Sequence, residues 1–313
     1  MKSERNKTID FNVEDGQKYL QNAISISSPT NTKTITNKTI IGNSFDVMDN
    51  LPKQFVDLMI VDPYYNIYKE FNGNKFKETT TEEYTKYTES WIVKTLPLLK
   101  ENASIYVCCD WKSSMIIGNV LSKYFIIQNR ITWEREKGRG SKTNWKNSME
   151  DIWFCTVNKN YTFNLNDVKI RKKVVAPYKE DGKPKDWEDT KNGRYRDTCP
   201  SNFWDDISIP YWSMPENTAH PTQKPEKLIA KLILASSNKN DVIFDPFVGS
   251  GTTSVVAKKL GRQYVGIEQN PTYVAWAEYR LHQAEIDNSI QGYTDNVFWE
   301  RNTLQEQKKY HNK

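Results

Sequence analysis

The chain has 313 residues, enough for one large α/β domain with an insertion or for two modest domains. Its 44 basic and 39 acidic side chains give a net charge of +5, which favours a polyanionic partner without resembling a histone-like tail. The sequence shows neither a run of about eighteen apolar residues nor a signal sequence, so we expect neither export nor membrane insertion. The cysteines lack CxxC spacing, which argues against a zinc site or disulfide framework and predicts reduced thiols in a cytoplasmic protein: Cys108, Cys109, Cys155 and Cys199.

Residues 1–36 are polar, and we interpret them as a loosely attached extension with no assigned chemistry, although Tyr19 and Leu20 could dock it locally. Short apolar runs bounded by polar residues then predict buried strands. Aromatic and apolar side chains at helical spacing predict a helix over residues 81–99, and residues 113–121 allow another. This strand–helix alternation predicts a mostly parallel sheet covered by helices on both faces. The predicted strands are residues 39–42, 56–61, 104–109, 125–133 and 151–157.

The periodicity disappears between residues 158 and 217, where Lys, Arg, Trp, Tyr, Asp and Pro are frequent. A stretch this long without clear elements far exceeds the usual connection of about 4–6 residues, so we interpret it as a functional insert. Regular patterns then return: helices over residues 225–236 and 252–260, strands over 241–247 and 263–268, and a last helix ending near 281. The predicted parts are an extension (1–36), half of an α/β domain (37–157), the insert (158–217), the other half (218–282) and a polar C-terminal extension (283–313).

A glycine turn joins one of these strands to the next helix. The segment DVIFDPFVGSGTT places Gly249 and Gly251 where missing side chains let the backbone bend and approach a ligand. Glu268 ends the following strand, where a carboxylate meets the ribose of an adenosine-containing cofactor; a tight turn with a surface acid is the alternative. The third glycine of the NAD pattern is missing, which favours S-adenosylmethionine (AdoMet). The residues of this motif expected to bind the cofactor are Asp245, Phe247, Gly249, Gly251, Thr252 and Glu268.

A second motif, VDLMIVDPYYN, ends an apolar strand in Asp62 and Pro63. In an open parallel sheet this loop and the glycine turn can face each other across the switch point. An exocyclic amino group of a base is a poor nucleophile, so catalysis needs acceptors for its hydrogens and an aromatic plane stacked on the base. The Asp62 carboxylate, the Pro63 carbonyl and the Tyr65 ring supply these, although the same residues also fit a simple proline turn that closes the strand.

Taken together, DPYY, the later segment HPTQKP (residues 220–225) and DPFVGSGT resemble the β group of DNA amino-methyltransferases. The resemblance covers about residues 38–282 and is weakest in the insert. The usual tetrapeptide of that family is DPPY, so Tyr64 replaces its second proline, and we expect a less rigid loop. The tetrapeptide precedes the glycine motif, an order that corresponds to a circularly permuted Rossmann-like AdoMet-binding domain.

The resemblance implies two further sets of AdoMet-binding residues. One set would line the adenine pocket, and many family members carry Asp at its first position, where this chain has Asn43. The other set lies in HPTQKP, near the methionine end of AdoMet, where Lys224 could meet the carboxylate. A simple lead-in to the next helix is the alternative for this second set. The implied residues are Asn43, Ser44 and Phe45, then His220, Thr222 and Lys224, with Asp62 at the same site.

Two basic segments are candidates for a DNA interface. Residues 131–153 combine basic and amide groups with Trp133 and Trp145, which suits phosphates and flipped or splayed bases. A solvated loop with core tryptophans is the alternative for this segment. The insert supplies further cationic side chains for phosphates, and which of them read bases is left open. The candidate DNA-binding residues are Arg139, Lys142, Lys146, Arg171, Lys172, Lys173, Arg194 and Arg196.

The resemblance implies a restriction-modification enzyme that methylates N6 of adenine in duplex DNA with the target base flipped out. It also implies a cognate restriction endonuclease and is compatible with a homodimer. An N4-cytosine methyltransferase is the nearest alternative, although its tetrapeptide typically begins with Ser rather than with an Asp such as Asp62. A glutamine or RNA methyltransferase and a catalytically silent DNA-binding module are further alternatives. We expect no metal, because the three histidines form no ligand cluster: His220, His282 and His311.

Overall fold

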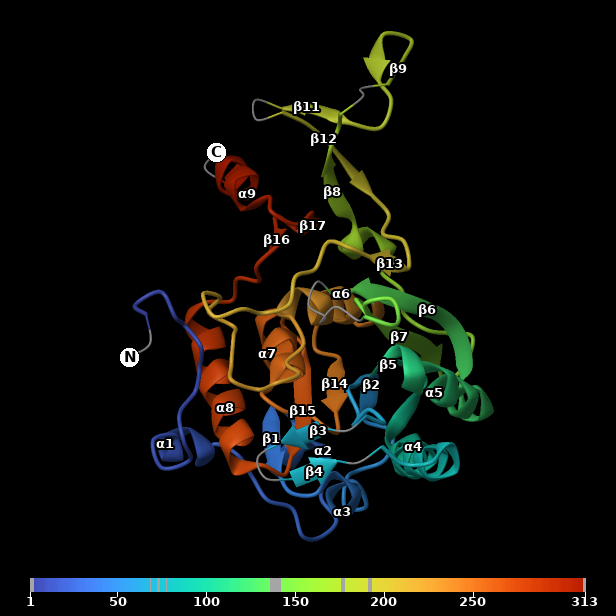
Figure 1. Ribbon diagram of the computed structural model, residues 1–313, viewed down its shortest axis with the longest axis vertical. Coiled ribbons are helices and arrows are strands. Elements are labelled where there is room, and N and C mark those ends of the chain that lie inside the picture. Colours follow the sequence, from blue (N-terminus) through green and yellow to red (C-terminus); the bar gives the residue numbers. More distant parts are fainter. Residues whose placement is uncertain are drawn as a thin grey trace.

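The centre of the computed structural model is an eight-stranded sheet in the order β1-β15-β14-β2-β5-β7-β6-β13 (Figure 1). Of these strands β7 alone runs antiparallel to its neighbours, β5 and β6, and the other pairs are parallel. The structure describes residues 3–67, 69–71, 74–76, 78–135, 142–175, 178–190 and 193–311. The strands are β1 (Lys38–Ile41), β2 (Val56–Val61), β5 (Leu99–Cys109), β6 (Ile126–Glu134), β7 (Met149–Thr156), β13 (Phe203–Trp204), β14 (Val242–Asp245) and β15 (Gln263–Glu268).

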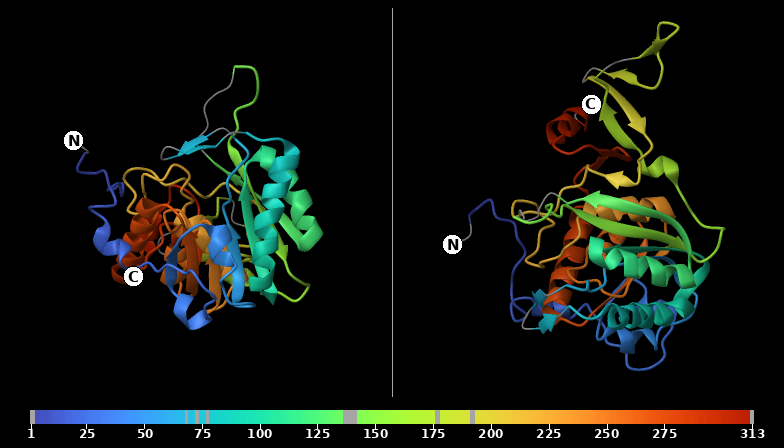
Figure 2. Two further views of the ribbon diagram at one scale, coloured as in Figure 1. Left: turned by 90° about the horizontal axis from the view of Figure 1, so that it is seen from below. Right: turned by 45° about the vertical axis from the view of Figure 1, so that its right-hand side comes forward.

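Helices cover both faces of this sheet (Figure 2). On one face α6, α7 and α8 share an apolar cluster with Leu58 and Ile60 of β2, and on the other α3, α4 and α5 share one with Met59 and Val61. Alternate residues of β2 are buried in the clusters on opposite faces of the sheet. Both sets must therefore be apolar, and the sequence of this strand is a continuous apolar run. The helices are α1 (Gln17–Leu20), α2 (Thr32–Ile35), α3 (Ser44–Met48), α4 (Thr81–Thr95), α5 (Trp111–Tyr124), α6 (Glu226–Ser236), α7 (Thr252–Lys259), α8 (Pro271–Ile286) and α9 (Leu304–His311), with 3-10 helices at η1 (Leu96–Leu98) and η2 (Leu165–Val168).

This architecture confirms the predicted Rossmann-like α/β fold. Every apolar run that we assigned to a strand forms one, with ends that differ by a few residues. The helix predicted over residues 81–99 begins with a capping box, in which Thr80 and Glu83 each accept a hydrogen bond from the other's backbone N–H. It ends earlier than predicted, because Pro97 lies in the 3-10 helix that follows α4.

The strand order creates a crevice between β14 and β2. These strands are neighbours, yet the chain leaves β14 through α7 toward β15 on one side and leaves β2 through α4 toward β5 on the other. Where connections diverge in this way, ligands bind outside the carboxyl ends of the strands. The DPYY loop follows β2 and the glycine turn follows β14, so the structure brings both motifs to the switch point.

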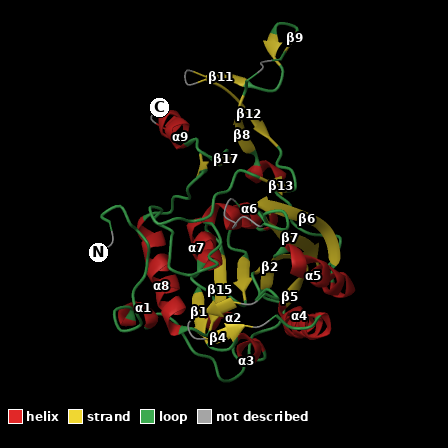
Figure 3. Ribbon diagram, in the orientation of Figure 1, coloured by secondary structure: helices red, strands yellow, loops and turns green. Residues whose placement is uncertain are grey.

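Residues 158–217, for which we expected no clear elements, contribute to a second sheet, and that expectation is wrong. This outer sheet has the order β11-β12-β8-β17-β16 and projects from the central one (Figure 1), in a part of the molecule where strands and loops predominate (Figure 3). Its strands are short, and those from residues 158–217 carry many charged side chains, so they lack the periodicity that predicts a strand. The C-terminal β17 pairs with β8, so two strands from the segment predicted as a polar C-terminal extension, β16 and β17, also belong to this sheet. Its strands are β8 (Ile170–Lys173), β11 (Glu188–Thr190), β12 (Gly193–Thr198), β16 (Tyr293–Thr294) and β17 (Val297–Trp299), and two hairpins are formed by β3 (Lys69–Phe71) with β4 (Asn74–Phe76) and β9 (Lys179–Glu180) with β10 (Lys183–Pro184).

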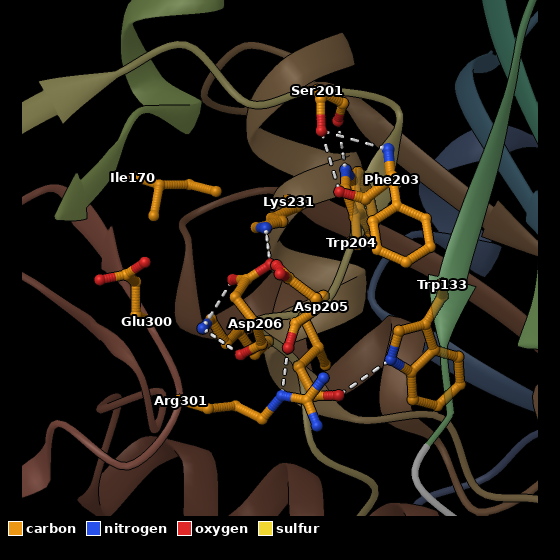
Figure 4. Close-up of polar contacts among 12 residues, drawn as sticks. Trp133, Ile170, Ser201, Phe203, Trp204, Asp205, Asp206, Lys231, Glu300 and Arg301 are labelled. Carbon is orange, nitrogen blue, oxygen red and sulfur yellow. Dashed lines mark hydrogen bonds and ion pairs between the residues drawn. The ribbon is translucent and has the colours of Figure 1, made fainter. Parts of the chain in front are cut away.

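A buried ionic cluster attaches the outer sheet to α6 (Figure 4). The Asp206 carboxylate accepts a hydrogen bond from Lys231 at 2.6 Å and lies 2.7 Å from the Lys227 ammonium. Lys227 also donates to the backbone carbonyl of Trp299, which ends β17. Burial raises the pKa of Asp206, but the two lysines outweigh it and hold this pKa below its usual value. Asp206 and Lys227 together thereby join the insert, the C-terminal segment and a helix of the central domain.

The N-terminal segment is docked, and our expectation of a loose extension is wrong for it. The Ile9 N–H donates to the carbonyl of Asn217 at 2.9 Å, and the Ile9 carbonyl accepts from the N–H of Ala219 at 2.9 Å. The Phe11 carbonyl accepts a hydrogen bond from the Trp276 indole at 2.9 Å, and the two rings meet edge to face. This segment therefore runs beside the residues that lead into HPTQKP.

Candidate active site

A cavity of about 870 Å³ lies at the crevice between β14 and β2. Four neighbouring strands contribute to its wall, because Asn43 follows β1, Glu268 ends β15, Asp245 ends β14 and Asp62 follows β2. Residues far apart in the sequence meet here because the carboxyl ends of their strands share one edge of the sheet. Of the predicted site residues, the wall includes Asn43, Ser44, Phe45, Asp62, Pro63, Tyr65, His220, Thr222, Lys224, Asp245, Phe247, Gly249, Thr252 and Glu268, while Gly251 lies beside it as the N-cap of α7.

The glycine turn brings backbone close to this cavity. Gly249 and Gly251 have φ values of +52° and +87°, which favour glycine over residues with a side chain. A Cβ on Gly251 would lie 2.6 Å from the Cβ of Ala277 and 2.8 Å from its Cα, so α7 and α8 could not pack as closely as they do. A Cβ on Gly249 would lie 3.1 Å from the imidazole Nε2 of His220, which brings HPTQKP against the turn.

Two carboxyl groups flank the turn, Asp245, which is buried, and Glu268, which is partly buried. Burial raises the pKa of Asp245 to about 7, although the Thr253 hydroxyl, at 2.6 Å, and the Phe247 N–H, at 3.0 Å, both donate to it. Burial also raises the pKa of Glu268, whose two oxygens accept hydrogen bonds from the backbone N–H groups of Gly249 and Asn270. Each carboxyl is held in a fixed orientation at the cavity wall, where it can accept hydrogen bonds from ligand hydroxyl or amino groups.

Asn43, Ser44 and Phe45 form the start of α3 at the far end of the cavity. The Asn43 side-chain oxygen Oδ1 accepts from the Phe45 N–H at 2.9 Å and caps the helix, and the Ser44 hydroxyl donates to the backbone carbonyl of Pro246. The ring of Phe45 lies 6.5 Å from that of Phe247, centroid to centroid. This end of the cavity therefore presents two aromatic rings, which suit a flat adenine.

The DPYY loop places a compact polar cluster on the cavity wall. The Tyr65 hydroxyl donates to Asp62 Oδ1 at 2.6 Å, and the Lys224 ammonium donates to Asp62 Oδ2 at 2.6 Å. Lys224 also lies 3.1 Å from the Tyr65 hydroxyl. Burial lowers the pKa of Lys224, but Asp62 and Glu150 outweigh it and raise that pKa, so the side chain carries a positive charge. The structure thus places Lys224 on Asp62, whereas the resemblance implied a contact with the AdoMet carboxylate.

Glu150 belongs to the same cluster and was missed by the sequence reasoning. Its Oε2 lies 3.4 Å from the Lys224 ammonium and 3.5 Å from the Tyr65 hydroxyl, and its Oε1 accepts from Arg135 at 2.6 Å. It sits near the start of β7, the antiparallel strand, where two acidic residues precede an apolar run. The available signal was this acidic pair at the start of a strand predicted to be buried. Because carboxylates are rarely buried without a partner, the pair indicated a cationic partner elsewhere in the chain.

Tyr64, the departure from DPPY, is held in place by its neighbours. Its hydroxyl donates to the carbonyl of Ile67 at 2.9 Å, and its own carbonyl accepts from the Tyr84 hydroxyl at 2.8 Å. Its ring meets that of Tyr87 edge to face, with 6.3 Å between centroids. These contacts to α4 restrain the loop in place of the rigidity that a second proline would supply.

The candidate DNA-binding residues fall into separate groups. Lys142 and Lys146 are exposed on the connection between β6 and β7, at the same edge of the sheet as the DPYY loop, while Arg139 lies outside the described residues. Between these two lysines Trp145 has 93 % of its surface exposed. This connection therefore presents two cationic side chains and an aromatic ring at the same edge of the sheet as the cavity.

The basic residues of the outer sheet divide between its two faces. Arg196 is the cross-strand partner of Lys172, so these two side chains share a face, and Arg194 shares it by alternation. On the other face Arg171 donates to the Asp197 carboxylate at 2.7 and 2.8 Å and lies over the Trp299 ring. Lys173 shares that second face. The five residues therefore cannot all meet one DNA surface, and Arg171 is already committed to Asp197.

The central sheet is Rossmann-like and carries a glycine turn, an acidic residue at the end of the next strand and an Asp-Pro-Tyr-Tyr loop across the switch point. These features together define an AdoMet-dependent methyltransferase. The chain belongs to the N6/N4 family of DNA methylases, whose family model matches residues 56–279. The match spans both motifs and the insert between them. The chain is thus a DNA methyltransferase.

Individual relatives agree with this assignment. The type II methyltransferase M1.MboII of Moraxella bovis is 34% identical over 257 residues, covering 78% of this chain and 96% of that protein. The DNA adenine methyltransferase YhdJ of Escherichia coli K12 is also 34% identical over 257 residues, covering 79% and 83%. The crystal structure of an M1.HpyAVI-SAM complex matches 78% of this chain and 98% of that one, with 25% identity and a TM-score of 0.51.

No group of three or more His, Cys, Asp or Glu side chains is arranged to hold a metal ion within the described ranges. None of the helices in the same ranges combines the length and the apolar character needed to cross a membrane.

Proposed function

We propose that this DNA methyltransferase transfers the methyl group of AdoMet to N6 of adenine in duplex DNA. The observation that carries the proposal is the position of Asp62, whose carboxylate lies on the wall of the cavity that Glu268 and the glycine turn also form. The group that would hold the amino nitrogen and the groups that would hold the cofactor therefore face one space.

The cavity fits AdoMet. We assign the ribose hydroxyls to Glu268, the adenine ring to the aromatic end at Phe45 and Phe247, and the methionine part to the side near His220 and Thr222. The glycine turn offers backbone N–H groups rather than a pyrophosphate cradle, which suits a cofactor without phosphate. AdoMet supplies an electrophilic methyl group on a positively charged sulfur, and the residues of this chain orient the nucleophile toward it.

Asp62 and Pro63 would hold the adenine amino group. The carboxylate and the Pro63 carbonyl each accept one amino hydrogen, which makes the nitrogen lone pair available for attack. We assign the ring of Tyr65 to contact with the base, although its hydroxyl points to Asp62 and its side chain is largely buried. Burial and the neighbouring carboxylates raise the pKa of Tyr65 well above its usual value, so it stays a neutral hydrogen-bond donor.

Adenine is favoured over cytosine by the first residue of the tetrapeptide. N4-cytosine enzymes of this type typically begin the loop with Ser, whereas this chain has Asp62. The relative YhdJ, named as a DNA adenine methyltransferase, points the same way. Cytosine N4 is the second candidate, because the family that matches residues 56–279 includes both chemistries.

The outer sheet and the β6–β7 connection would bind the DNA. We assign phosphate contacts to the face that carries Lys172, Arg194 and Arg196, and to Lys142 and Lys146 at the same edge of the central sheet as the cavity. A base inside the duplex could not reach Asp62, so the target base must flip out. By analogy with the type II relatives, we propose that methylation protects DNA from a cognate restriction endonuclease. A homodimer is a further proposal, which rests on the family resemblance alone.

The test is to incubate the protein with labelled AdoMet and unmodified duplex DNA, digest the DNA and identify the modified base by mass spectrometry. We expect N6-methyladenine. N4-methylcytosine would replace the proposal with the second candidate. An absence of product on duplexes of varied sequence would contradict it and favour a silent DNA-binding protein.

A further inference from the structure

Both oxygens of the Asp62 carboxylate are engaged by groups of the chain itself. Tyr65 donates to Oδ1 at 2.6 Å, and Lys224 donates to Oδ2 at the same distance. The proposed function asks this carboxylate to attract hydrogens of the adenine amino group. A full positive charge in direct contact with Oδ2 opposes that task, because it neutralises the negative charge that would polarise the amine.

Glu150 is a second carboxylate within reach of the same lysine. The Lys224 ammonium lies 2.6 Å from Asp62 Oδ2 and 3.4 Å from Glu150 Oε2, so it stands between two acceptors and contacts one of them more closely. The Lys224 and Glu150 side chains are only 8% and 7% exposed, whereas that of Asp62 is 23% exposed on the cavity side. A lysine has a flexible stem, and a small rotation would exchange its partners.

Glu150 is built to receive this charge. Arg135 donates to its Oε1 at 2.6 Å, which fixes the side chain while leaving Oε2 directed at Lys224. An Arg–carboxylate contact of this length holds the glutamate side chain in a fixed orientation. The neighbouring Cys108 thiol is buried, and burial raises its pKa well above the usual value, so it remains neutral and adds no competing charge.

We propose that Glu150 is a positioning residue that draws Lys224 away from Asp62 when adenine enters the cavity, and thereby frees the Asp62 carboxylate for the amino group. This inference rests on the proposed function. In the transfer step the N6 lone pair forms the bond to the methyl carbon, and the electrons of the sulfur–carbon bond remain on sulfur. One amino proton then passes to Asp62 and from there to water. Lys224 keeps its proton throughout and changes only its partner.

The test is Glu150→Gln, which preserves size but removes the charge that attracts Lys224. With enzyme in excess over duplex DNA, we expect the single-turnover rate constant for methyl transfer to fall about tenfold or more. The dissociation constants for AdoMet and for duplex DNA should change less than about twofold, since Glu150 acts after binding. Glu150→Asp, which keeps the charge on a shorter stem, should recover part of the rate.

A matched control separates this role from a structural one. Glu134 lies at the end of the adjoining strand β6 and forms an ion pair of 2.6 Å with Arg301, so Glu134→Gln removes a comparable contact outside the cavity. Its single-turnover rate should equal that of the wild type. In a Lys224→Met background, Glu150→Gln should have little further effect, because the residue acts through the lysine.

Three outcomes would overturn the inference: a wild-type rate in Glu150→Gln, a loss confined to DNA or AdoMet affinity, or an undiminished loss in the Lys224→Met background. Failure of the proposed function looks different. In that case the wild-type protein itself yields no N6-methyladenine, whatever residue occupies position 150.

Discussion

The central and outer sheets are built on opposite principles. The strands at the middle of the central sheet, such as β2 and β14, are apolar runs buried on both faces, and the candidate site lies at the carboxyl ends of β1, β15, β14 and β2. The outer sheet has short strands that carry charged side chains, and ion pairs such as Arg171–Asp197 cross it. The central sheet therefore positions a reaction at a fixed edge, whereas the outer sheet exposes basic side chains such as Arg196 over a small core of Tyr195, Val297 and Trp299.

Of the variants that distinguish the roles of the two sheets, Asp62→Ala should have the largest effect on methyl transfer. If the central sheet alone performs the transfer, this variant should lose at least about a hundredfold in single-turnover rate, because an acceptor aligned with the amino group is gone. AdoMet and duplex DNA should bind with nearly unchanged affinity. Rate constants from rapid quench and affinities from calorimetry measure the two effects, and near-normal transfer by the variant would remove Asp62 from the mechanism.

Gly251→Ala should lower both the stability of the protein and its affinity for AdoMet, because Gly251 belongs to the glycine turn at the cavity. The residue has φ +87°, and an added Cβ would meet the backbone and side chain of Ala277, so we expect a loss of about 1–3 kcal/mol in unfolding free energy. AdoMet affinity should fall with it, because the turn lines the cavity. Thermal denaturation and calorimetry measure both.

Gly261→Ala is the matched control for this variant. Gly261 also has a positive φ, +72°, but an added Cβ would meet nothing within 4 Å. We expect a stability loss of about 1 kcal/mol from backbone strain alone and a normal affinity for AdoMet. Equal losses of stability and of AdoMet affinity in the two variants would show that close packing against Ala277 is unimportant.

The smallest expected effects concern the outer sheet, where two arginines on adjacent strands should behave differently. Arg196 is exposed, and Arg196→Ala should weaken duplex binding and reduce the slope of log affinity against log salt by about 1, as the loss of one phosphate contact requires. Arg171 is bound to Asp197, so Arg171→Ala should lower the melting temperature and leave that slope unchanged. A change of slope in Arg171→Ala would place DNA on the opposite face.

The sequence revealed those parts whose signal is local. Apolar runs marked the central strands, and the glycine turn, Glu268 and Asp62 could be placed together because each follows or ends a strand of a parallel sheet. Contacts made across the fold were not accessible in this way. The position of Lys224 between Asp62 and Glu150 depends on β7 running antiparallel beside β5, which no local pattern in either segment specifies. The outer sheet escaped prediction because β8 and β17 come from segments far apart in the chain and are too short to show periodicity.

The most direct test of the account is a crystal structure of the protein with S-adenosylhomocysteine and a duplex that contains its target site. We predict an adenine rotated out of the helix, with its N6 within hydrogen-bond distance of the Asp62 carboxylate and the Pro63 carbonyl. The outer sheet should contact the phosphates through the face of Arg196. A target adenine that remains stacked in the duplex, or a flipped base whose amino group contacts neither Asp62 nor Pro63, would contradict the assignment of this edge of the sheet as the catalytic site.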